Sequence, residues 1–118
     1  KKSFDDVGDT YQYYSILSGQ EGRVFYFEIP ENWVGFLEKI YVSQIALCYS
    51  TLIIDKGFNK IIYTSPVEFK PPVFVKENIE VRSNNGTATP QLFEVYIKGF
   101  ACNLPYEIKK RREEISVG

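Results

Sequence analysis

The residues that could do acid–base or metal chemistry are carboxylates, because the 118-residue chain contains no histidine. Histidine is the side chain that most often serves as a general base near neutral pH and as a metal ligand. Its absence excludes serine–histidine and cysteine–histidine catalysis, and histidine-containing zinc sites, for the isolated chain. Asp5, Asp6 and Asp9 lie close together but lack the spacing and the downstream glutamate of a calcium-binding loop. We interpret them as a solvated acidic segment, and we expect no metal site and no cofactor.

Five glutamates could supply the carboxylate pair of a glycosidase, whose two members lie about 5–10 Å apart across a cleft. Each of the five occupies an outward position in a segment of alternating polarity, so a solvent-facing strand residue explains it without a cleft. They are Glu28, Glu38, Glu68, Glu80 and Glu94. We therefore predict no catalytic residues and no enzyme activity, and we keep a sandwich-fold hydrolase only as a third hypothesis.

Aromatic residues are abundant, with nine Phe, nine Tyr and one Trp. Exposed aromatic side chains stack on sugars or nucleobases or anchor protein interfaces, whereas buried ones fill the space between two sheets. Trp33 falls in a loop-like stretch, residues 30–35, and is the aromatic that core packing explains least. Tyr11 and Tyr13 share one strand parity and Tyr14 has the other, so at least one of them must be exposed. We predict an interface role for Tyr11, Tyr13, Tyr14 and Trp33, with core filling as the open alternative.

A basic run near the end of the chain is a further candidate for the interface. It consists of Lys109, Lys110, Arg111 and Arg112. Glu113 and Glu114 follow at once and offset half of its charge. The whole chain, with 14 basic and 15 acidic residues, has a formal charge of −1. We interpret the run as a solvated or partner-docking tail and expect no nucleic-acid partner.

The elements that must position these residues are strands, because polarity alternates with period two through most of the chain. Turn-forming residues interrupt the alternation at roughly 8–12-residue intervals, which is typical of a sandwich or barrel. The segments expected to form strands are residues 10–17, 23–29, 36–47, 51–54, 59–64, 66–75, 79–83 and 92–98. We predict an all-β chain: an antiparallel sandwich of about eight strands, jelly-roll-like, over residues 10–104. An N-terminal arm (1–9) and a charged C-terminal tail (105–118) flank it.

Two of these segments carry finer predictions. Residues 36–47 are apolar on both faces, which favours a central strand that bends between sheets. Residues 66–75 contain three prolines, which cannot donate to a ladder, so this segment should form an edge strand or a crossing between sheets.

Cys48 and Cys102 are interpreted as two free thiols, although the spacing alone leaves one disulfide open. No apolar run reaches the roughly 20 residues of a membrane helix, so we expect no membrane partner.

The order of several segments resembles the small jelly-roll structural proteins of tailed-phage virions, such as head decoration, fibre-base and adaptor components. The resemblance covers residues 19–100 and rests on residues 23–30, 35–42, 55–57, 66–75 and 78–81. Such proteins have no active site, so the resemblance carries over no functional residue. It implies a role in which repeated copies assemble on a virion and reach their neighbours through extended ends.

Two hypotheses from different classes follow. The first is a non-enzymatic virion structural protein that forms a homo-oligomer and docks its arm and tail on other virion structural proteins, such as capsid or collar subunits. The second is a carbohydrate-binding sandwich module in which Trp33 and exposed tyrosines form a stacking platform. Oligomeric state separates the two, because the first requires an assembly and the second does not.

Overall fold

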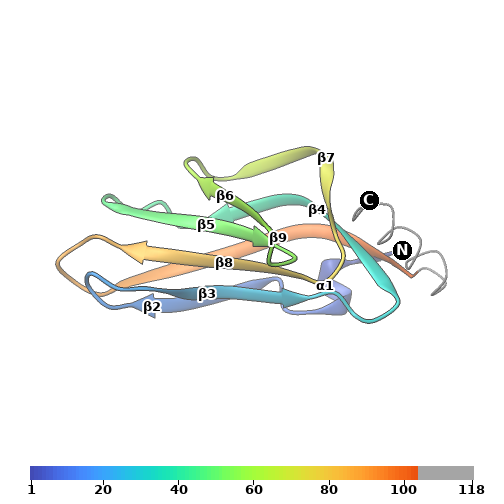
Figure 1. The fold of residues 1–118 in the computed structure, drawn as a ribbon, viewed down its shortest axis with the longest axis horizontal. Coiled ribbons are helices and arrows are strands. Elements are labelled where there is room, and N and C mark those ends of the chain that lie inside the picture. Colours follow the sequence, from blue (N-terminus) through green and yellow to red (C-terminus); the bar gives the residue numbers. More distant parts are fainter. Residues whose placement is uncertain (104–118) are drawn as a thin grey trace.

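The computed structural model describes residues 1–103 and confirms the all-β antiparallel sandwich (Figure 1). Its strands run mainly along the long axis of the molecule, and the N-terminus lies at one end. The elements in chain order are β1 (Lys2–Ser3), α1 (Phe4–Val7), β2 (Tyr11–Ile16), β3 (Glu21–Glu28), β4 (Trp33–Val42), β5 (Cys48–Ile54), β6 (Phe58–Ile62), β7 (Val67–Val75), β8 (Asn78–Asn85) and β9 (Gln91–Asn103).

The strand order is that of a jelly roll, which periodicity alone could not establish. One sheet has the order β2–β9–β4–β7, with β1 pairing beside β2 on the far part of β9, and the other has the order β3–β8–β5–β6. All strand pairs are antiparallel. The chain crosses between the sheets at every connection from β2 to β9 except the β5–β6 hairpin. This is the double-sheet, eight-stranded arrangement of jelly rolls, with β1 as a two-residue addition.

The core lies between the two sheets and follows the alternation of the strands except at two register shifts, between Arg23 and Phe25 in β3 and between Leu37 and Lys39 in β4. Phe25 and Phe27 of β3 and Phe93 of β9 are at most 3% exposed. They pack with aliphatic side chains that alternate inward along the other strands, which include Leu37, Ile40, Leu52, Ile79, Val81, Val95 and Ile97. Burial of these side chains is the main favourable term holding the sheets together.

The N-terminal segment, predicted as an arm, lies against the sandwich over residues 1–9. Lys2 and Ser3 pair with β9, and the Ser3 hydroxyl caps α1 by accepting a hydrogen bond from the Asp5 backbone N–H (3.2 Å). Phe4 is 1% exposed, and its ring centroid lies 4.9 Å from that of Phe27. A Cβ at Gly99 would collide with the Phe4 ring, so the glycine makes room for it. One buried aromatic therefore anchors the segment to the core.

The two long edges of the sandwich differ. At the β2/β3 edge, the Gln12 side-chain amide donates to the Tyr26 carbonyl oxygen (2.6 Å) and accepts from the Tyr26 N–H (3.0 Å). At the other edge β6 and β7 each pair on one side only, as β2 and β3 do, and no side-chain bridge of the kind made by Gln12 is found between these two strands in the described residues. Two features protect these free edges from pairing with another chain: β7 contains Pro71 and Pro72, and β6 places Lys60 opposite the buried Leu52. The prediction of an edge strand over residues 66–75 is confirmed.

Two other features complete the fold. The single strand predicted over residues 36–47 is wrong at its end, because β4 stops at Val42 and residues 43–47 form a loop in which Leu47 has a φ of 67°. Both Cys48 and Cys102 are free thiols, as predicted. In the described part of the chain, no helix is long and apolar enough to cross a membrane.

Candidate functional site

The acidic residues of the N-terminal segment make local structural contacts. The Asp5 carboxylate accepts a hydrogen bond from the Thr10 hydroxyl (2.5 Å), and the Asp9 carboxylate accepts one from the Tyr11 N–H (3.3 Å). Across residues 1–103, no three histidine, cysteine, aspartate or glutamate side chains gather as metal ligands would. The segment therefore functions as a tether for the start of β2.

The five glutamates divide between the two sheets. Glu28 and Glu80 belong to the second sheet, where Glu80 forms ion pairs with Arg23 (3.3 Å) and Arg82 (3.4 Å). The remaining three, Glu38, Glu68 and Glu94, belong to the first sheet. Two of them, Glu38 and Glu68, share an open hollow of about 330 Å³ with Lys39, Lys70 and Lys98. Because three cations share this hollow, it has the composition of a surface ion-pair cluster.

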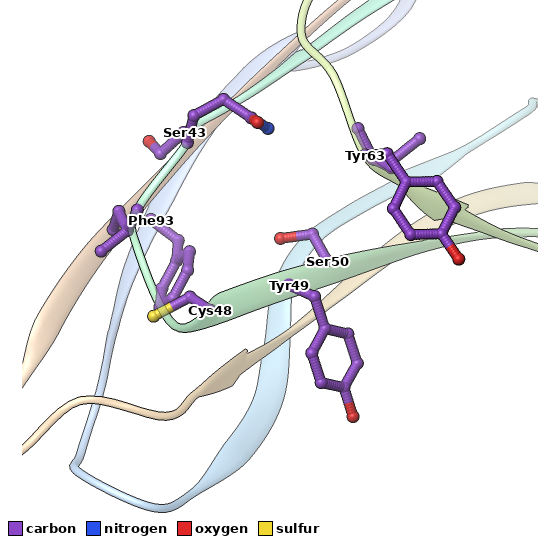
Figure 2. Close-up of a pocket in the computed structure, with 9 residues that line it drawn as sticks. Ser43, Cys48, Tyr49, Ser50, Tyr63 and Phe93 are labelled. Atoms are coloured by element: carbon purple, nitrogen blue, oxygen red, sulfur yellow. The ribbon is translucent and has the colours of Figure 1, made fainter.

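A smaller pocket of about 110 Å³ opens between the β4–β5 loop and the end of β6 (Figure 2). Its walls include Ser43, Cys48, Ser50 and Phe93, and the rings of Tyr49 and Tyr63 point away from the Cys48 sulfur. The Ser50 hydroxyl is hydrogen-bonded to the Ser83 hydroxyl (2.7 Å), with no adjacent base to activate it. Ligand pockets usually have volumes of about 300–1,000 Å³. This one is smaller and has room for a single side chain.

The most extensive aromatic surface lies on the outer face of the first sheet. Tyr96 of β9 is paired with Tyr11 of β2 on one side and with Tyr41 of β4 on the other. Residues directly opposite each other in antiparallel strands project from the same face, so the three form a row. Tyr13 continues the row along β2, with its ring centroid 6.0 Å from that of Tyr11. We call these four residues the tyrosine face; their exposures are 46% (Tyr11), 63% (Tyr13), 42% (Tyr41) and 39% (Tyr96).

The same outer face continues toward β1 as a row of half-buried phenylalanines. Phe36 is paired with Phe100 on one side and with Phe74 on the other. The Phe36 ring centroid lies 5.0 Å from that of Phe100 and 5.6 Å from that of Phe74, and the Lys1 ammonium lies 4.1 Å from the Phe100 centroid. A paired row containing Lys98 and Lys39 separates the phenylalanines from the tyrosines. Glu68 of β7 is paired with Lys39 on the other side, so the face is aromatic at both ends and carries charges of both signs between them.

The electrostatics of the tyrosine face keep Tyr11 protonated. Partial desolvation raises the pKa of the Tyr11 phenol above its usual value of 10.0, and the negative charge and hydrogen bond of Glu94 raise it further. On the opposite sheet, desolvation and the hydrogen bond to Glu28 (3.1 Å) likewise raise the pKa of Tyr26. The Tyr11 hydroxyl thus donates to Glu94, and its oxygen can accept a hydrogen bond from a partner.

The structure brings together only some of the residues predicted from sequence. Tyr11 and Tyr13 share the tyrosine face, whereas Tyr14 projects from the other side of β2 and is 59% exposed. Trp33 is half-buried at the far end of β4, where it packs against the core and lies 5.7 Å from the Lys2 ammonium. The four basic residues, Lys109, Lys110, Arg111 and Arg112, lie outside the described residues.

Sequence reasoning missed Tyr96 and did not associate Tyr41 with Tyr11. The parity signal for Tyr96 was present, because it stands between the outward residues Glu94 and Lys98 in an alternating run. What parity could not supply was the register that pairs β9 with both β2 and β4. The row of three tyrosines is therefore a property of the topology.

No family model matches the chain, and no curated protein or solved structure matches it.

Proposed function

We propose that the chain is a non-enzymatic structural protein of a virion, which assembles with copies of itself and docks on neighbouring virion subunits. The observation that supports assembly most directly is the tyrosine face, which has the properties of a protein-binding surface. Jelly rolls serve many unrelated functions, so the fold alone assigns none. The virion setting comes from the sequence resemblance over residues 19–100.

The tyrosine face has the properties of a protein-binding surface. Tyrosine is enriched at interfaces and among the residues that contribute most binding energy. It buries a large ring while its hydroxyl keeps a hydrogen-bond partner. Here Tyr41 and Tyr96 stand on β4 and β9, whose inward side chains Ile40, Val95 and Ile97 are fully buried, and Tyr11 and Tyr13 stand on β2, which is paired with β9. The backbone beneath the rings is fixed by the core, which limits the ordering cost of binding.

Mass measurement of the purified chain, together with binding assays against the other components of its virion, tests the proposal. We expect an oligomer with a fixed number of copies, and binding to at least one other virion component. A stable monomer that binds none of them would contradict it. Catalytic turnover that depended on Glu38 and Glu68 would contradict the non-enzymatic part.

Carbohydrate binding is the second candidate, and one observation favours it: the tyrosine face is open, with adjacent rings 6.0 Å apart at Tyr11 and Tyr13. Sugar rings stack on such surfaces through their apolar faces. Because Trp33 is half-buried at the far end of β4, this alternative depends on the tyrosines. A glycan panel distinguishes the two functions. Glycan binding that is lost in Tyr11→Ser and Tyr96→Ser variants of a monomeric chain would favour this alternative over assembly.

A further inference from the structure

One end of the sandwich carries four loops that contain no charged residue. They are residues 17–20, 43–47, 63–66 and 86–90, the connections β2–β3, β4–β5, β6–β7 and β8–β9, seen at the left of Figure 1. The connections toward the opposite end contain Asp5, Asp6, Asp9, Glu31, Asp55, Lys56, Lys76 and Glu77. A quarter of the chain is charged, so the absence of charge from the first four loops distinguishes this end. We call it the uncharged end.

The uncharged end also presents large apolar side chains to solvent. Leu17 is 65% exposed, Leu47 is 79% exposed and Tyr63 is 80% exposed. Leu47 has a φ of 67°, in the left-handed region that residues with a branched side chain rarely adopt. Its carbonyl oxygen lies where a Cβ at Gly86 would stand, so the loop is closely packed. The chain thus holds a leucine outward in an unfavourable conformation that brings it no apolar burial within the molecule.

These loops are held together by one buried side chain. The Asn85 amide donates to the carbonyl oxygens of Ile16 (2.8 Å) and Thr89 (2.9 Å) and accepts from the Thr87 backbone N–H (2.9 Å). The Cys48 thiol donates to the same amide oxygen (3.7 Å). Asn85 therefore links three of the four loops, and the apolar tips are positioned before any partner arrives, which lowers the cost of ordering on binding.

The pocket of about 110 Å³ opens at this end (Figure 2), and Leu47 directly precedes Cys48, one of its lining residues. Its lining includes the apolar side chains of Ile45, Ile62 and Phe93, and Tyr49 and Tyr63 stand at its side. The pocket is somewhat smaller than the ~150 Å³ apolar cavity that holds benzene, a size suited to one aliphatic side chain. The uncharged end thus places a protruding leucine next to a leucine-sized pocket.

We propose that the uncharged end binds the uncharged end of a second copy, with Leu47 of each copy entering the pocket of the other. A two-fold contact requires a self-complementary surface: if a residue of one copy contacts a given site on the second copy, the same residue of the second copy contacts the same site on the first. Leu47 belongs to the same loop as the lining residues Ser43 and Ile45, so a two-fold axis can pass between the leucine and the pocket. The absence of charge means that two identical surfaces meet without like-charge repulsion.

The size of the end is consistent with a stable contact. The two shorter extents of the molecule are 30 and 23 Å, so the cross-section open to an end-to-end contact is at most roughly 700 Å² per copy, against the ~800 Å² per partner of standard interfaces. A lipid surface is the weaker match. Peripheral membrane sites combine apolar tips with lysine or arginine, and none of these loops has either.

This contact is separate from the tyrosine face, so it goes beyond the proposed function and can fail independently of it. The test uses the full chain in a background where Tyr11→Ser and Tyr96→Ser weaken the tyrosine face. We expect this parent variant to dimerise with increasing concentration in sedimentation equilibrium. Adding Leu47→Asp should weaken dimerisation at least about tenfold, because it places a charge in the pocket of the other copy. Phe58→Asp, at a 50% exposed residue of β6 beside the β5–β6 turn, is the matched control and should leave the dimer intact.

Cys48 supplies a second readout, because its thiol lines the pocket and is partly exposed. Alkylation of Cys48, followed by mass spectrometry with Cys102 as the internal reference, should slow as the dimer forms and recover in the Leu47→Asp variant. A parent variant that stays monomeric up to its solubility limit would overturn the inference. So would a dimer and a Cys48 alkylation rate that Leu47→Asp leaves unchanged, or a monomer that binds phosphatidylcholine vesicles through Leu47.

Discussion

The side chain of Gln12 makes the two hydrogen bonds to the Tyr26 backbone that a neighbouring strand residue would otherwise make (2.6 and 3.0 Å). The amide thereby joins β2 of the first sheet to β3 of the second and closes one edge of the sandwich. Because Tyr11 and Tyr13 flank Gln12 in sequence and project to the opposite side, this contact also fixes the orientation of half of the tyrosine face. One polar residue thus connects the stability of the fold to the candidate interface.

Replacing Gln12 should destabilise the protein through the polar groups it leaves behind. Gln12→Ala removes both partners of the Tyr26 backbone, and we expect a loss of about 1–3 kcal/mol in the free energy of unfolding. Gln12→Glu keeps the acceptor for the Tyr26 N–H but sets a carboxylate oxygen against the Tyr26 carbonyl oxygen, so it should also destabilise the protein. Urea denaturation measures both, with the exposed Gln20→Ala as the control. A Gln12→Ala variant as stable as the control would show that water replaces the amide without cost.

The β5–β6 turn should depend on one carboxylate. Asp55 accepts hydrogen bonds from the backbone N–H groups of Lys76 (2.9 Å), Glu77 (2.6 Å) and Asn78 (3.1 Å). It thereby ties the hairpin to the β7–β8 turn. Hydrogen bonds to a charged acceptor are stronger than neutral ones, so Asp55→Ala should cost about 2–4 kcal/mol. Asp55→Asn should cost less, because the amide keeps an acceptor and asparagine tolerates the φ of 52°.

Thermal denaturation of the two Asp55 variants, with the exposed loop substitution Glu31→Ala as the control, checks this order. Equal melting temperatures for Asp55→Ala and Glu31→Ala would contradict it.

The N-terminal segment should contribute to stability through Phe4. Removing a buried phenylalanine side chain typically costs about 3–5 kcal/mol, and Phe4 is 1% exposed beside Phe27. We expect a loss of that size for Phe4→Ala. The half-exposed Phe58→Ala should lose far less. Denaturant unfolding compares them, and an effect of Phe4→Ala no larger than that of Phe58→Ala would mean that the segment is dispensable.

Tyr11 should titrate above pH 10. Its folded-state pKa is raised by desolvation and by Glu94, so the neutral phenol is the form that the fold favours. The corresponding stability is fully present below the unfolded pKa near 10 and is lost as the pH rises through the folded pKa. Ultraviolet titration of tyrosinate measures this, and Glu94→Gln should move the Tyr11 pKa down. A Tyr11 pKa that is indifferent to Glu94→Gln would contradict the assignment.

Much of the fold could be predicted because the strands alternate clearly. In β9, Phe93, Val95 and Ile97 alternate with Glu94 and Lys98, so parity alone places the core side of the strand. The prolines at 71 and 72 likewise favoured an edge strand. The end of β4 was missed because Ile45, Ala46 and Leu47 resume the apolar pattern after Ser43 and Gln44. Pattern alone does not separate an exposed apolar loop from a continuing strand.

The candidate site was harder to predict, because its members come together through register. Tyr11 and Tyr96 are 85 positions apart in the chain and become neighbours only through the β2–β9 pairing. Trp33 sits in a stretch rich in turn residues, which favoured a loop, yet it begins β4 and packs against the core. Nothing in the local sequence distinguishes a tryptophan that packs against the core at the end of a strand from one that is exposed and available to bind a ligand.

The central claim is that the tyrosine face binds protein, and sedimentation velocity over a concentration series tests it most directly. The comparison is between the wild-type chain, the Tyr11→Ser and Tyr96→Ser double variant, and Tyr26→Ser, which removes an outward tyrosine from the other sheet. We predict that the double variant loses at least about tenfold in association constant, whereas Tyr26→Ser associates like the wild type. Identical association by all three chains, or a wild-type chain that is monomeric alone and with its virion components, would contradict the account.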